Sequence, residues 1–173
     1  MRFRTAGPAD ADRIVAVVNA AYRAEGAGGW TTEAHLLEGI RTDRAEIIDL
    51  LSAEGSSVVL AEDEDAGLVG CVHVRREGAD DAHLGMLSVD PARQAKGVGR
   101  DLIERAEATA RGWGCMWMRM HVLSARPELL AYYERRGYGR TGVEEPFDVP
   151  ERIGRSRVGV LRFLELQKRL RDA

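Results

Sequence analysis

The stretch VDPARQAKGVGRDL, residues 89–102, joins the end of an apolar strand to the start of a helix through a basic loop. The loop holds Gly97 and Gly99, although glycine in a helix costs about 0.5–1 kcal/mol relative to alanine. The amides and dipole of a helix N-terminus attract anions, and phosphate can approach closely where no side chain intervenes. Three basic residues add positive charge, namely Arg93, Lys96 and Arg100. The stretch predicts a pyrophosphate-binding loop; the alternative is a tight strand–helix connection with incidental basic residues.

The size and composition of the chain are those of an ordinary globular domain. Its 173 residues are 45% hydrophobic and 31% charged, which predicts one domain over residues 1–173 with a sizeable core. The net charge of −3 argues against nucleic acid as a partner. The sequence contains no apolar run near the roughly 20 residues that cross a bilayer, so no membrane partner is expected. No secretory signal is visible at the start, and we expect a cytoplasmic protein.

The two cysteines, Cys71 and Cys115, lie in apolar runs typical of strands. Neither has the CxxC or CxxH spacing of a metal site. We therefore expect two buried thiols in a reducing compartment and no bound metal.

The order of apolar periodicities predicts a mixed α/β fold, an α+β sheet with helices on both faces. The expected elements are a strand at 2–5, a helix at 9–26, helical segments at 31–39 and 42–55, strands at 56–63, 68–77 and 83–89, a helix at 98–111, a strand at 115–122, a helix at 127–137 and a final strand within 155–170. Met118 and Met120 share one face of their strand and are expected in the core. Glu107 and Arg111 have the spacing of an ion pair on the outside of their helix.

Two familiar phosphate-binding patterns do not fit the glycine loop. The chain has no GxxxxGK[ST] run, and GVGRDL lacks the third glycine of GxGxxG. The segment RQAKGVG instead resembles the Q/R-x-x-G-x-G/A signature of the GNAT superfamily of N-acetyltransferases. LSVDP before it and LLAYYERRGY after it are similar to segments of the same family, and the motif-bearing part covers residues 83–138.

The resemblance implies a GNAT-like acyl-CoA N-acyltransferase fold, with a mostly antiparallel sheet splayed between its fourth and fifth strands. It also implies acetyl-CoA as cosubstrate and no metal. The main chain of Leu87, Ser88 and Val89 would pair with the pantetheine arm. The pyrophosphate would lie on the loop residues Gln94, Ala95, Lys96, Gly97, Val98 and Gly99, with Arg100 adding charge. Arg126 stands where the family usually has a cofactor-contacting asparagine, and Leu129 where it has alanine.

The catalytic residues follow from the needs of acetyl transfer. A departing thiolate benefits from an acid, and Tyr133, which falls on the tyrosine of the family, is the candidate. The alternative for Tyr133 is a packing role, and Tyr132 is expected in the core. An alkylammonium with a pKa of about 10.4 must lose its proton, and His83 is the candidate base. A strand cap is the alternative for His83, whereas Glu33 or a water chain could serve as the base.

The remaining histidines are weaker candidates. His73, on the neighbouring strand, is a lesser alternative as base, and His121 and His35 are expected to be structural or solvated. The acceptor site is expected after the first helix, where Trp30 would form an apolar wall and Glu33 would attract a cationic amine. The alternatives are a core anchor for Trp30 and an ordinary first-turn helix charge for Glu33.

The sequence thus predicts an N-acetyltransferase that moves an acetyl group from acetyl-CoA to a primary amine of a small molecule or protein, by direct attack in a ternary complex. A non-catalytic acyl-CoA-binding sensor or interaction module is the alternative. The acceptor, the preferred acyl length and the oligomeric state, including a homodimer, stay open.

Overall fold

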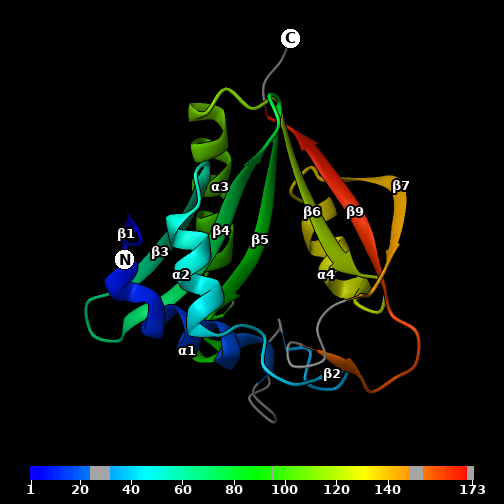
Figure 1. Ribbon diagram of the computed structural model, residues 1–173, viewed down its shortest axis with the longest axis horizontal. Helices are drawn as coiled ribbons and strands as arrows, with labels where there is room; N and C mark the ends of the chain where they lie inside the picture. The colour runs from blue at the N-terminus through cyan, green and yellow to red at the C-terminus, as the bar shows by residue number, and fades with distance from the viewer. Residues whose placement is uncertain (24–31, 95, 149–153, 171–173) are drawn as a thin grey trace.

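The computed structural model of the protein describes residues 1–23, 32–94, 96–148 and 154–170 (Figure 1). Its helices are the 3-10 turns η1 (Pro8–Asp10) and η2 (Pro91–Arg93) and the α-helices α1 (Ala11–Arg23), α2 (Arg44–Ser52), α3 (Val98–Gly112) and α4 (Pro127–Glu134). Its strands are β1 (Arg2–Thr5), β2 (Leu37–Glu38), β3 (Ser56–Asp63), β4 (Gly67–Glu77), β5 (Asp81–Val89), β6 (Trp117–Leu123), β7 (Gly139–Pro146), β8 (Arg155–Ser156) and β9 (Arg162–Arg169).

Seven strands form one twisted sheet in the order β1-β3-β4-β5-β6-β9-β7. Within this sheet the neighbouring strands run antiparallel except β5 and β6, which are parallel. The pairing of β5 with β6 covers only Asp81–Trp117 to His83–Arg119, and beyond it the two strands diverge (Figure 1). The expected mixed sheet with a splay between these strands is therefore confirmed.

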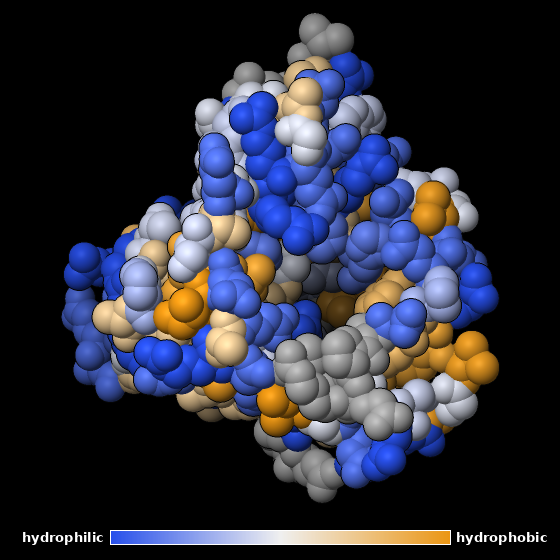
Figure 2. Space-filling model, viewed as in Figure 1, coloured by the Kyte–Doolittle hydropathy of each residue, from blue (hydrophilic) through white to orange (hydrophobic). Residues whose placement is uncertain are grey.

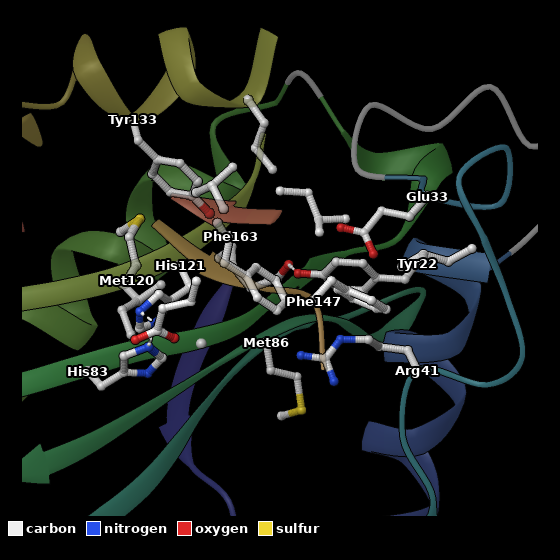
Figure 3. A pocket seen from close by; sticks show the side chains of 18 of the residues that line it. Tyr22, Glu33, Arg41, His83, Met86, Met120, His121, Tyr133, Phe147 and Phe163 are labelled. Carbon is white, nitrogen blue, oxygen red and sulfur yellow. Dashed lines mark hydrogen bonds and ion pairs between the residues drawn. The ribbon is translucent and has the colours of Figure 1, made fainter. Parts of the chain in front are cut away.

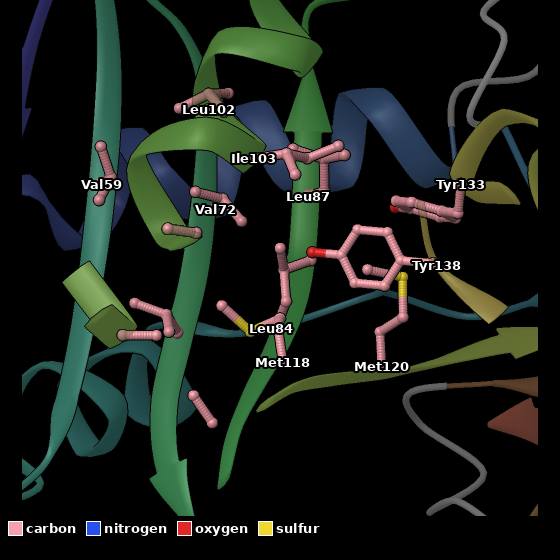
Figure 4. Close-up of a cluster of buried hydrophobic side chains, with 14 of the residues drawn as sticks. Val59, Val72, Leu84, Leu87, Leu102, Ile103, Met118, Met120, Tyr133 and Tyr138 are labelled. Atoms are coloured by element: carbon pink, nitrogen blue, oxygen red, sulfur yellow. The ribbon is translucent and has the colours of Figure 1, made fainter. Parts of the chain in front are cut away.

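The sheet lies between two helical layers, as its side-chain alternation predicts. On β3, Val58 and Leu60 pack in the cluster that includes α1, whereas Val59 and Ala61 pack in the cluster that includes α3. Figure 4 shows the second cluster, in which Leu102 and Ile103 of α3 lie against the sheet. Successive side chains of a strand point to opposite faces, so apolar residues on both faces predict this double cover.

The alternation of β5 is interrupted by a bulge. The register between β4 and β5 shifts between Cys71 and His73, so that Met86 and Leu87 together oppose one residue of β4. Met86 has a φ of 52°, which is uncommon for a residue other than glycine. As a result Met86 belongs to the cluster with α1 and Leu87 to the cluster with α3. Bulges often lie beside functional sites, where they redirect the chain.

The ion pair expected on the outside of α3 is instead part of a buried network. Glu107 is 3% exposed, and its carboxylate accepts hydrogen bonds from the Tyr138 hydroxyl at 3.0 Å and from Lys168 Nζ at 2.8 and 2.9 Å. Arg111 also donates to Glu107, at 3.1 Å. The prediction was wrong about exposure because Lys168 of β9 compensates the charge and Tyr138, in the segment after α4, adds a hydrogen bond, and both lie far away in the sequence.

Three elements differ from the expected ones. The segment expected as a helix over 31–39 contains a turn and the short strand β2, which pairs with β8. Leu36 and Leu37 are buried there against Leu123 and Leu161, so tertiary contacts outweigh the helical pattern. The strand expected within 155–170 is divided into β8 and β9, and β7 was not expected because its mostly exposed residues carry no apolar alternation.

Candidate active site

A cavity of about 320 Å³ lies where β5 and β6 diverge. Figure 2 shows this face of the molecule, hollowed between its two halves, with hydrophobic side chains at the floor of the hollow. Apolar residues form much of the wall, namely Leu37, Leu84, Met86, Leu87, Met120, Val122, Leu123, Leu129, Phe147 and Phe163. The polar lining residues are Tyr22, Arg23, Glu33, Arg41, His83, His121, Tyr133 and Glu145. An apolar cleft with a few convergent polar groups is the usual form of a small-molecule site.

Tyr133 enters the cavity from α4 (Figure 3). Its side chain is 5% exposed, and its ring packs edge-on against Tyr132 and Tyr138, with centroid distances of 5.4 and 5.9 Å. Burial raises the pKa of Tyr133 well above its ordinary value, so the hydroxyl keeps its proton at neutral pH. The residue expected as a proton donor thus lines the cavity in its protonated form.

His83 and His121 form a pair on the other side of the splay. His83 Nε2 lies 3.0 Å from His121 Nδ1, and the two rings stack with centroids 5.3 Å apart. The register explains the contact: His83 is opposite Arg119, and His121 is the next residue on the same face of β6. Burial lowers the pKa of His83 to about 4, so this imidazole is neutral at neutral pH. This pKa lies well below the ordinary imidazole value of about 6.5.

Tyr22 connects α1 to the bulge of β5. Its hydroxyl donates to the carbonyl oxygen of Leu87 at 2.8 Å, and burial raises its pKa to about 12. This bond holds the main chain of β5 beyond the short stretch that pairs with β6. It also engages one of the carbonyls expected to meet pantetheine, although a carbonyl oxygen can accept two hydrogen bonds.

Glu33 lines the cavity, but its charge is already compensated. Its carboxylate lies 3.2 Å from Arg23 Nη1 and 3.9 Å from Arg126 Nη1. Arg126 is 2% exposed, contacts Glu128 as well and, in the described part of the chain, is absent from the cavity wall. The structure therefore gives Arg126 carboxylate partners where the family resemblance implied a cofactor contact. Trp30 lies outside the described residues.

The glycine loop meets the N-terminus of α3 beside the end of β5. Gly97 is the N-cap with a φ of +85°, a left-handed conformation that glycine adopts at little cost, and among the described residues no side chain caps the helix. A Cβ on Gly99 would lie 3.1 Å from the Tyr132 hydroxyl, so Tyr132 is at this loop as well as against the core. Gln94 Nε2 donates to the Val89 carbonyl at 3.0 Å.

The other loop and strand residues are placed as follows. In the loop, Lys96 and Arg100 are exposed, and the guanidinium of Arg100 donates a hydrogen bond to Asp101. Val98, at the start of α3, is buried. Ser88 of β5 is also buried, and its hydroxyl donates to the Met86 carbonyl at 3.1 Å. Ala95 lies outside the described residues.

Sequence reasoning missed five polar residues of the cavity, Tyr22, Arg23, Arg41, His121 and Glu145. Tyr22 lies four residues after Val18 on the apolar stripe of α1, which was a usable signal. His121 was expected to be structural or solvated, and only the register of β5 with β6 reveals its neighbour. Nothing in the sequence indicated that Arg41 lines the cavity, because the segment just before it was expected to be a helix.

No metal centre or membrane span is found in the described residues. No group of three potential metal-binding side chains occurs in residues 1–23, 32–94, 96–148 and 154–170. Within the same part of the chain, none of the helices has both the length and the apolar character to cross a membrane. Cys71 and Cys115 are buried free thiols, as expected.

Solved structures share this fold over nearly the whole chain. The yncA protein of Salmonella typhimurium, solved with its cofactor acetyl-CoA, is 22% identical, with a TM-score of 0.71 over 100% of this chain and 95% of that one. The ribosomal-protein-S18-alanine N-acetyltransferase of Escherichia coli is 14% identical, with a TM-score of 0.72 over 99% and 95%. These likenesses show that the chain has the same fold as these two proteins.

Curated relatives match over part of the chain. A mycothiol acetyltransferase of Beutenbergia cavernae is 27% identical over 51% of this chain and 30% of its own length. A probable glucosamine 6-phosphate N-acetyltransferase of Oryza sativa subsp. japonica is 28% identical over 56% of this chain and 62% of its own. The matched segments thus span less than two thirds of both relatives.

The model of the acetyltransferase (GNAT) family matches residues 15–138, and the chain belongs to this family of acetyltransferase enzymes.

Proposed function

We propose that the protein transfers an acetyl group from acetyl-CoA to a primary amine by direct attack in a ternary complex. The observation that carries the proposal is one cavity at the splay that brings together Tyr133, His83 and the main-chain bulge at Leu87. A donor, a proton acceptor and a bent strand in one apolar cleft are the groups that acyl transfer to an amine needs.

In the proposed mechanism the two protonatable residues act in succession. His83 accepts a proton from the bound ammonium, and the amine nitrogen then forms a bond to the acetyl carbon. The carbon–sulfur bond breaks, the thiolate receives the proton of Tyr133, and the nitrogen loses its surplus proton to solvent. The proton held by His83 returns through solvent to Tyr133. The net change converts acetyl-CoA and an amine into an N-acetylamine and CoA, with both side chains restored.

Two features support acetyl-CoA as the donor. Left-handed Gly97 opens the first turn of α3 without a side-chain cap among the described residues, so amides of that turn are available to a pyrophosphate. β5 and β6 have no mutual pairing beyond His83–Arg119 in the described sheet, which leaves room for an extended pantetheine arm beside Leu87, Ser88 and Val89. Arg100 and Lys96, both exposed near this turn, would add positive charge.

Gly99→Val is expected to weaken acetyl-CoA binding at least tenfold, about 1.4 kcal/mol, because branched atoms would occupy the approach to the first turn of α3. Calorimetry with acetyl-CoA measures the effect. The added Cβ would also press on the Tyr132 hydroxyl at 3.1 Å, so the matched control is Gly99→Val combined with Tyr132→Phe. Equal weakening of acetyl-CoA binding in both variants would show that the loss arises at the glycine loop and not from the contact with Tyr132. Wild-type affinity in a folded Gly99→Val protein would place the pyrophosphate elsewhere.

The function itself is tested by thiol release. The protein is mixed with acetyl-CoA and a panel of small amines, amino acids, aminoglycosides, polyamines and peptides, and free CoA thiol is followed with a colorimetric reagent. We expect amine-dependent release with at least one acceptor class, accompanied by an N-acetyl product in the mass spectrum. Acetyl-CoA binding without release for any amine would favour the sensor alternative instead.

A further inference from the structure

Arg41 is a cationic side chain at the cavity that has no anionic partner in the described structure. Its guanidinium carbon lies 5.4 Å from the centroid of the Tyr22 ring. Within residues 1–23, 32–94, 96–148 and 154–170, no carboxylate pairs with this guanidinium and none of its nitrogens donates a hydrogen bond to the protein. An unpaired guanidinium beside an apolar cleft costs free energy unless a ligand or water completes its hydrogen bonds.

The main chain holds Arg41 in this position. Asn19 of α1 accepts hydrogen bonds from the backbone amides of Arg41 and Thr42, at 2.7 and 3.3 Å, and donates to the Thr42 carbonyl at 2.9 Å. Thr42 is fully buried, and its hydroxyl donates to Glu46 at 2.8 Å. The side chain of Arg41 is therefore carried by an anchored segment, which is how a binding group is kept in place before its ligand arrives.

The nearest carboxylate of the cavity wall does not neutralise Arg41. Glu33 is shared by Arg23 and Arg126, at 3.2 and 3.9 Å. Burial lowers the pKa of Arg23, and the positive charge of Arg41 lowers it further. Among the described residues, the guanidinium of Arg41 therefore adds a positive charge to this end of the cavity that no carboxylate pairs with.

The two ends of the cavity differ in chemistry. Figure 3 shows Tyr22, Glu33 and Arg41 reaching in from one side, and Tyr133, His83 and His121 from the other. Apolar residues lie between them, Met86, Phe147 and Phe163 among those labelled. An acceptor bound in this cavity would have a guanidinium on one side, proton-transfer groups on the other and apolar side chains along the wall between them.

We propose that Arg41 binds the carboxylate of the acceptor and that the acceptor is an amino acid with an apolar side chain. The inference rests on the proposed acetyl transfer and names its substrate class. A guanidinium pairs with a carboxylate through two parallel hydrogen bonds, which fixes both charge and orientation. One guanidinium balances a single negative charge, so a carboxylate fits this end better than a dianionic phosphate. The amine of such an acceptor faces Tyr133 and His83 while its side chain lies on the apolar wall.

The first test uses the wild-type protein and matched acceptors. Leucine, leucinamide and isoamylamine share one apolar group, but only leucine has the carboxylate; methionine and phenylalanine provide two further sets of the same kind. We expect kcat/KM for at least one of the three amino acids to exceed that of its amide and its decarboxylated amine tenfold or more. Equal rates for acid, amide and amine would overturn the carboxylate proposal while leaving acetyl transfer intact. A higher rate with 3-aminopropyl phosphate than with any of the amino acids would overturn it in favour of phosphate.

The second test changes the side chain. Arg41→Gln should raise KM for the preferred amino acid at least tenfold, leave kcat nearly unchanged and leave KM for the matching amide unaltered, whereas Arg41→Lys should restore part of the loss. The control is Arg44→Gln, because Arg44 is exposed and pairs with Asp12 at 3.2 Å outside the cavity. An undiminished preference for the carboxylate in folded Arg41→Gln would overturn the assignment. Absence of turnover with every amine would instead reject the proposed function itself.

Discussion

Tyr133→Phe is expected to slow the acetyl-transfer step about 10²-fold or more while the affinity for acetyl-CoA changes little. The hydroxyl proton is needed only when the thiolate departs, so its loss affects the transition state rather than the bound ground state. The ring should stay in place, because it is 5% exposed and packs between Tyr132 and Tyr138. Single-turnover rates and calorimetry with acetyl-CoA measure the two effects separately.

The control for this variant is Tyr138→Phe, which removes a buried tyrosine hydroxyl from the segment between α4 and β7. That hydroxyl donates to Glu107 at 3.0 Å, so its removal should lower stability without slowing the chemical step. If Tyr133→Phe reduces affinity and rate together by a factor that corresponds to one hydrogen bond, about 1 kcal/mol, the hydroxyl anchors the cofactor. An unaltered single-turnover rate in Tyr133→Phe would reject the acid assignment.

His83→Ala is expected to lower turnover by about 10²- to 10⁴-fold, the range for loss of a general base. His73→Gln is the matched control, because burial lowers the pKa of this second histidine to about 4 as well. Its Nε2 lies 2.8 Å from the Ser56 hydroxyl, and His73 does not line the cavity in the described structure. A loss of activity in His73→Gln with none in His83→Ala would show that His73 is the base and that His83 is not.

The pH–rate profile provides an independent check on His83. Since burial lowers its pKa to about 4, the folded enzyme holds the base neutral above that pH and protonated below it. The acidic limb of kcat/KM that belongs to the enzyme should therefore lie near pH 4. The rate should stay level above that pH and fall only where the amine itself loses its proton, because the proposed substrate is the ammonium form. A break near pH 6.5 that disappears in His83→Ala would show that the imidazole titrates as if solvated.

Local features of the sequence account for the parts of the site that were predicted. The glycine loop was recognisable because its chemistry depends on residues a few positions apart: Gly97 adopts a φ of +85° where the strand end meets α3. Tyr133 was recognisable from the segment around it, and the helix that carries it begins at Pro127 as expected. The segment around Leu36 and Leu37 was mistaken for a helix, since two adjacent leucines suit either element until their neighbours are known.

The sequence by itself determined the positions of most strands of the sheet and of the loop at the start of α3. It could do so because side-chain alternation and turn chemistry depend on residues that are close together in the chain. The contacts that complete the cavity join residues far apart: His83 meets His121 across 38 positions, and Tyr22 meets Leu87 across 65. The first contact depends on the parallel register of β5 and β6 and the second on the bulge at Met86, and neither leaves a trace in local composition. The lowered pKa of His83, and the guanidinium of Arg41 without a carboxylate partner among the described residues, follow from burial and from charges assembled in three dimensions, so only the tertiary structure decided them.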